Sequence, residues 1–220
     1  MERAHFESEL IGLKEQISRM ARLAVSAVDQ SVAAFVNHRR GIVDDVLAAE
    51  GALNELQVGL DDRALRLIAL QQPTARDLRL ILAAVRANVD VERIGDHAVN
   101  LAHLATALAG REPNLVETTL VGMADLATGM LRDAVSAFIS GDVELARSVL
   151  ARDDAQDQEL GSVFPPVIEQ MRERPASAEF GVRLLLFARN LERIADHATN
   201  IAEQAIFLVE ARDVRHGRGE

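Results

Sequence analysis

The sequence predicts an all-α protein built as two tandem antiparallel three-helix bundles, six long helices in all, related by internal duplication. Apolar residues recur at three- and four-residue spacing in long Ala- and Leu-rich stretches, the pattern of amphipathic helices, and strand-like alternation is nowhere sustained. Residues 91–102 (VERIGDHAVNLA) return 100 residues later as residues 191–202 (LERIADHATNIA), with 8 of 12 positions identical. A second match, at an offset of 103, joins residues 20–36 to residues 123–139.

Helix-breaking residues divide the first copy into three helices. The first is expected over residues 6–38, before a glycine, and the second over residues 42–70, because the proline that follows disfavours helix in the residue before it. The third is expected over residues 74–110, with Thr74 as N-cap and Asp77, three residues on, completing a variant capping box.

The second copy repeats this arrangement. Helices are expected over residues 113–140, 142–174 and 177–211, the last with Ser177 as N-cap. The middle helix contains Pro165-Pro166, which removes two backbone donors, so we expect it to kink or split there.

The duplication also predicts the domain organisation. The first bundle should occupy residues 1–111, the second residues 112–212, and a short C-terminal tail residues 213–220. Helices of about 30 residues are about 45 Å long, and short loops between such helices favour antiparallel packing.

Composition excludes several classes of function. The chain has no cysteine, so disulfides, zinc–thiolate sites and iron–sulfur clusters are excluded. It has no Trp or Tyr, and 24 basic against 34 acidic residues give a net charge of −10, which disfavours binding to nucleic acid. No uncharged apolar run reaches the ~18 residues of a bilayer span, and the N-terminal region is acidic where a signal peptide would be basic. We therefore expect a cytoplasmic protein with no direct membrane insertion.

The repeated segment carries a polar stripe on the third helix of each copy. At about 100° per residue these side chains share one face. The stripe consists of Glu92, Asp96, Asn100 and His103 in the first copy and of Glu192, Asp196, Asn200 and Glu203 in the second. The same line continues a row of aliphatic residues, so the carboxylates are expected to face a neighbouring helix rather than water.

A second polar pair lies on the preceding helix of each copy. It is Asp153 and Asp157 in the second copy, and Glu50 and Asn54 at the matching positions of the first. If the two helices face each other, clustered oxygen donors result, with Asn100 and Asn200 as further candidate ligands. Such donors suit Mg²⁺, Mn²⁺, Ca²⁺ or iron better than copper or zinc. The second copy should hold the stronger site, because Asn54 replaces a carboxylate.

The alternative for these carboxylates is that they are edge charges paired with nearby arginines. His97 and His197, beside the stripe, are expected at a helix–helix contact or in solvent rather than as metal ligands.

The ordered set of motifs resembles the PhoU family of phosphate-signalling regulators. The motifs are residues 72–80 (QPTARDLRL), the two repeated signatures, and residues 213–216 of the tail. The resemblance implies two three-helix bundles, a homodimer, and clusters of iron or another metal (Mn, Mg and Zn remain open). It assigns the metal to Glu92 and Asp96, Asp153 and Asp157, and Glu192 and Asp196, with Glu50 in the remaining place and Asn54 departing from the acidic pattern.

The same resemblance implies a non-enzymatic negative regulator of phosphate uptake and of the phosphate-starvation response. Its partners would be the ATPase of the phosphate ABC transporter and a membrane sensor histidine kinase. Two alternatives stay open: a metal-dependent phosphoester hydrolase, because carboxylate clusters with two metals also serve phosphoryl transfer, and a metal-free structural helical bundle. The absence of an evident general acid or basic phosphate clamp near the carboxylates argues against the hydrolase.

Overall fold

The computed structural model describes residues 2–39, 41–110 and 116–214, and the side chains from residue 5 onward within these ranges. It confirms the predicted fold class: six long helices account for most of the described residues, and no strand occurs among them. The first bundle consists of α1 (Glu2–Val36), α2 (Val43–Gln71) and α3 (Ala75–Leu108). The second consists of α4 (Glu117–Ser140), α5 (Val143–Leu150), α6 (Asp153–Glu173), a 3₁₀ turn η1 (Pro175–Ser177) and α7 (Ala178–Glu210).

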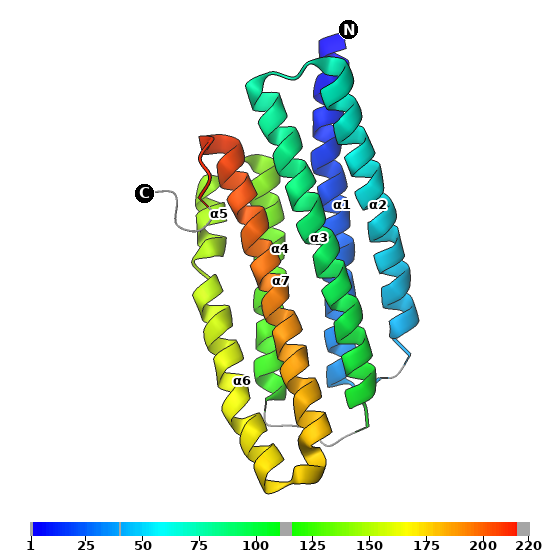
Figure 1. Cartoon of the computed structure of the whole chain (residues 1–220), viewed down its shortest axis with the longest axis vertical. Helices are drawn as coiled ribbons and strands as arrows, with labels where there is room; N and C mark the ends of the chain where they lie inside the picture. The colour runs from blue at the N-terminus through cyan, green and yellow to red at the C-terminus, as the bar shows by residue number, and fades with distance from the viewer. Residues whose placement is uncertain (1, 40, 111–115, 215–220) are drawn as a thin grey trace.

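The two bundles lie side by side, with α2 and α6 at opposite outer edges (Figure 1). Helix α1 packs along α4, and α3 packs along α7, so the apolar faces of all the long helices join one continuous core. Phe35 of α1 contacts Phe187 of α7, with ring centroids 4.7 Å apart. The core therefore crosses the boundary between the copies, and aliphatic and alanine side chains fill most of it.

Several predicted helix ends are confirmed. The Asp77 carboxylate accepts hydrogen bonds from the Thr74 backbone N–H (3.2 Å) and hydroxyl (2.7 Å) at the start of α3. Gly141 ends α4 with a φ of 75°, a left-handed conformation that glycine adopts without strain. Ser177 precedes α7 as expected, but its hydroxyl donates backward to the Arg174 carbonyl (2.7 Å) and does not cap the helix. The expected start of the fourth helix at residue 113, and the bundle boundary at residues 111–112, reach into 111–115, outside the described residues.

Of the kink or split expected at Pro165-Pro166, the split does not occur, because α6 runs through both prolines. The chain instead leaves the helix at Ala151 and Arg152, between α5 and α6. The carbonyls that lose their partners to the prolines belong to Gly161 and Ser162, which are exposed residues, so water can hydrogen-bond to them.

At the observed break, the Arg152 guanidinium donates to Asp133 of α4 (2.7 Å). The two acidic residues that follow begin the first turn of α6, where negative charge is favourable. These contacts favour a new helix start at this point.

No helix in the described part of the chain is long and apolar enough to cross a membrane.

Candidate functional site

The first carboxylate cluster lies where α2 packs on α3. Glu50 and Asn54 project from α2 and Glu92 and Asp96 from α3, with Asp96 exposed and the other three half-buried. Burial raises the pKa of Glu92, and the negative charges of Asp96 and Glu50 raise it further, against the lowering effect of an adjacent arginine. The Asn54 amide donates to Glu50, and Asn54 Oδ1 is buried without a partner. The predicted residues therefore meet, with three carboxylates and one amide.

A glycine sets the close approach of these two helices. A Cβ at Gly95 of α3 would lie 2.7 Å from Leu53 Cδ1 of α2, a distance that no real contact allows. The fully buried Leu53 thus occupies the space that the missing side chain leaves. This packing holds the α2 and α3 carboxylates face to face.

The second cluster lies between α6 and α7 and contains four carboxylates. Asp153 and Asp157 come from α6, and Glu192 and Asp196 come from α7. Burial raises the pKa of Asp153, with Asp196 as the next largest cause, and burial followed by Asp196 raises the pKa of Glu192. Glu192 is only 6% exposed, and its Oε2 has no hydrogen-bond partner. Mutual repulsion and an unsatisfied oxygen are concentrated in this cluster.

The carboxylates are not preassembled around a metal position. Among the described residues, no three His, Asp or Glu side chains converge closely enough to hold an ion. Arginines engage two of them instead: Arg189 donates to Glu192 (3.0 Å) and Arg193 to Asp196 (3.1 Å). The donor set fits an oxygen-preferring cation in its chemistry. Glu192 Oε2 accepts no hydrogen bond but lies 3.8 Å from Arg193 Nε, so Glu192 and Asp196 would have to leave their arginine partners to ligate an ion.

The two asparagines of the predicted stripe lie elsewhere. Asn100 is exposed on α3. Asn200 donates to Asp90 of α3 (3.1 Å), so its amide serves the contact between the bundles.

This contact between α3 and α7 forms a pseudo-twofold polar cluster. His197 Nδ1 lies 2.9 Å from Asp90 Oδ1, and His97 Nδ1 lies 2.9 Å from Asn190 Oδ1. The two imidazole rings stack, with centroids 5.6 Å apart. Of the two environments expected for the histidines, a helix–helix contact or solvent, the structure shows the first for both. Asp90 and Asn190 escaped sequence reasoning, although their shared position one residue before each repeated signature was a usable signal.

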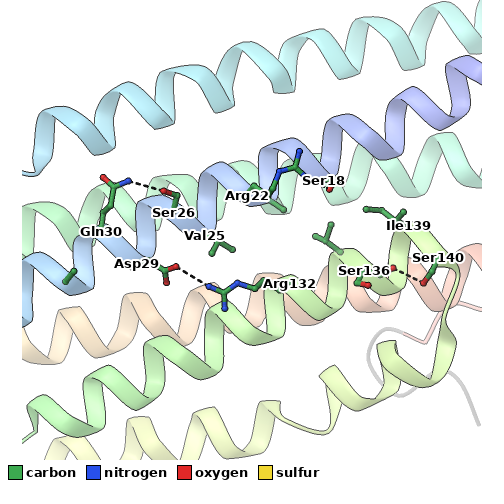
Figure 2. Close-up of a pocket in the computed structure, with 13 residues that line it drawn as sticks. Ser18, Arg22, Val25, Ser26, Asp29, Gln30, Arg132, Ser136, Ile139 and Ser140 are labelled. Atoms are coloured by element: carbon green, nitrogen blue, oxygen red, sulfur yellow. Dashed lines mark hydrogen bonds and ion pairs between the residues drawn. The ribbon is translucent and has the colours of Figure 1, made fainter.

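An apolar groove runs between α1 and α4, with a volume of about 830 Å³. Figure 2 shows the Arg132 side chain extending from α4 to Asp29 on α1, an ion pair of 3.1 Å that crosses the groove. Small and aliphatic side chains, Val25 and Ile139 among them, line most of the rest, together with Arg22 and Gln30.

The model of the PhoU domain matches this chain twice, over residues 17–105 and 120–205, once in each bundle. The chain belongs to the PhoU family. A phosphate-specific transport system accessory protein PhoU homolog of Pseudomonas putida is 35% identical over 214 residues, covering 96% of this chain and 83% of the relative. Its counterpart in Caulobacter vibrioides strain NA1000 is 35% identical over 214 residues, covering 97% of this chain and 93% of the relative.

Solved PhoU structures share the architecture. The crystal structure of PhoU from Pseudomonas aeruginosa is 31% identical and superposes with a TM-score of 0.90, covering 94% of this chain and 100% of that one. The structure of the phosphate transport system regulatory protein PhoU from Streptococcus pneumoniae is 26% identical, with a TM-score of 0.87. The match covers 95% of this chain and 99% of that one. The resemblance inferred from the sequence motifs is confirmed over nearly the whole chain.

Proposed function

We propose that this PhoU-family protein acts in the cytoplasm as a non-enzymatic accessory protein of phosphate-specific transport, repressing phosphate uptake and the phosphate-starvation response. The supporting observation is family membership over nearly the full length, with relatives named as accessory proteins of that transport system. The streptococcal structure is named as a regulatory protein.

The proposed partners are the ATPase of the phosphate ABC transporter, the sensor histidine kinase of the phosphate two-component system, and a second copy of the chain. The architecture supports a role through protein contacts, since long helices present extended surfaces on both bundles. Affinity capture from phosphate-replete and phosphate-starved cells tests the first two partners. Recovery of neither in either condition contradicts the adaptor role.

Deletion of the gene tests the regulatory role directly. Phosphate-starvation genes should stay expressed in high phosphate, and reintroducing the intact gene should silence them. Unchanged expression in the deletion strain contradicts the proposal. Hydrolysis of phosphoesters by the purified protein with Mn²⁺ or Mg²⁺, if Asp196→Asn abolishes it, contradicts the non-enzymatic part.

We also propose that the second carboxylate cluster binds a metal ion, with iron, Mn, Mg and Zn as candidates. Support comes from Glu192 Oε2, which is buried and accepts no hydrogen bond, and from the carboxylate repulsion that a cation would relieve. Asp153, Asp157, Glu192 and Asp196 would hold the ion, and a bound ion would supply charge neutralisation across the α6–α7 contact. The first cluster, with three carboxylates and Asn54, should bind less tightly.

Metal content measured by mass spectrometry tests this order of affinity. The double variant Glu192→Gln/Asp196→Asn should lose most of the bound metal. The matched variant Glu92→Gln/Asp96→Asn, in the first cluster, should lose less. If both double variants contain as much metal as the unmodified protein, the carboxylates are ordinary charges that bind no metal, and the proposal is contradicted.

A further inference from the structure

A second cavity, of about 690 Å³, lies away from both carboxylate clusters, at the end of the molecule where α3 begins and α4 and α7 end (Figure 1). Helices α1, α3, α4 and α7 contribute to its lining. Three cationic side chains meet there: Lys14 of α1, and Arg76 and Arg79 in the first turns of α3. The two arginines belong to the QPTARDLRL motif, to which neither the regulatory proposal nor the metal proposal gives a role.

None of these three cations has a carboxylate at ion-pair distance among the residues that the structure describes. Two carboxylates also line the cavity, Glu7 and Asp77. Asp77 is engaged by the Thr74 backbone and hydroxyl in the capping box. Three positive against two negative groups leave an excess of positive charge in a chain whose net charge is −10.

The donors of these cations are only partly satisfied. Arg79 Nε is buried and has no hydrogen-bond partner. Lys14 Nζ donates to the Ile139 carbonyl at the C-terminal end of α4 (2.7 Å). Burial lowers the pKa of Lys14, and the positive charge of Arg76 lowers it further. An anion placed among these groups would relieve the repulsion between Lys14 and Arg76 and accept from the guanidinium groups that line the cavity.

We propose that this cavity binds a phosphate group. Guanidinium groups present planar pairs of donors that match phosphate oxygens, and a lysine adds a point charge, so the two arginines and Lys14 suit a tetrahedral dianion. The cavity is larger than one phosphate ion, and Leu80 and Leu208 give it aliphatic walls. A phosphate monoester with an organic remainder therefore fits as well as free phosphate. The proposal is independent of the regulatory role.

The first test uses the unmodified protein, because Lys14 is the only lysine in the chain. An amine-directed acetylating reagent, with the Lys14 peptide quantified by mass spectrometry, reports on this cavity alone. Inorganic phosphate, glycerol 3-phosphate and phosphatidic acid vesicles in phosphatidylcholine are added separately, with sodium chloride holding the ionic strength constant. We expect at least one source to slow acetylation about fivefold or more without slowing acetylation of a free lysine derivative. No protection by any source overturns the proposal.

The second test measures affinity by equilibrium dialysis with radiolabelled phosphate, or by vesicle co-sedimentation if only the lipid protects. Arg79→Gln should weaken binding about tenfold or more, the usual effect of losing a charged hydrogen bond. Arg19→Gln is the matched control: it makes the same charge change at an exposed arginine of α1 outside the cavity, and should leave affinity unchanged. Equal affinity in the two variants overturns the proposal. If Arg79→Gln does not fold, the Lys14 protection result decides.

Discussion

Replacing Asp90 with alanine should weaken the contact between the two bundles, because its carboxylate is the shared acceptor of His197 and Asn200. The His197 side chain is 11% exposed, so water cannot readily replace the lost acceptor. An unsatisfied buried donor costs about 1–3 kcal/mol, and the half-buried Asn200 bond adds about 0.5–1.5 kcal/mol. We expect a loss of about 2–4 kcal/mol, which at about 2–4 °C per kcal/mol lowers the Tm by about 4–16 °C.

The equivalent contact in the pseudo-twofold cluster, between His97 and Asn190, supplies a matched control for this prediction. Asn190→Ala removes the hydrogen-bond partner of Nδ1 of the half-buried His97 and should cost only about 0.5–1.5 kcal/mol. Asp90→Asn should recover part of the loss, since an amide oxygen still accepts one bond. Urea denaturation followed by circular dichroism at 222 nm measures all three variants. A loss for Asp90→Ala no larger than that for Asn190→Ala refutes the reasoning.

Three further predictions concern the metal cluster, an ion pair and a helix contact. Metal at 100 times its Kd should stabilise the unmodified protein by about 2.7 kcal/mol and raise its Tm by about 5–11 °C. The double variant Glu192→Gln/Asp196→Asn should lose this shift in thermal scans. With chelator present, the variant should melt no lower than the unmodified protein. Arg63 of α2 donates a hydrogen bond to Glu9 (2.7 Å), which lowers the pKa of Glu9 below 4.5. The ion pair therefore stabilises the fold above about pH 4.5, and this stabilisation is lost as the pH falls through the lowered pKa. Glu9→Gln should therefore cost about 0.5–1 kcal/mol at pH 7 and nothing at strongly acidic pH, and a constant difference in urea titrations across this range would contradict the assignment. Gly95→Ala should destabilise by about 1 kcal/mol, because overpacking outweighs the gain in helix propensity, whereas Gly51→Ala, with open space around it, should stabilise by about 0.5–1 kcal/mol; the same sign for both would refute the packing argument.

Local patterns determined most of the fold. The 3.6-residue period makes helices, and glycine and proline end most of them, because these effects depend on neighbours a few residues away. The i, i+4 spacing alone places Glu192 and Asp196 on one helix face, and the repeat shows that the second bundle copies the first. The Thr74–Asp77 capping box is equally local and formed as predicted.

Only the tertiary structure decided how these parts act on each other. The contact of His197 with Asp90 joins residues 107 positions apart, and no local pattern shows which helices of the two bundles will pack together. The sequence could not exclude a split of α6 at its prolines, because the cost depends on whether the freed carbonyls reach water, which is a matter of burial. The sequence by itself determined helices, their duplication and which carboxylates share a face. Whether those carboxylates meet arginines or one another depends on the side-chain conformations that packing selects among alternatives of similar energy.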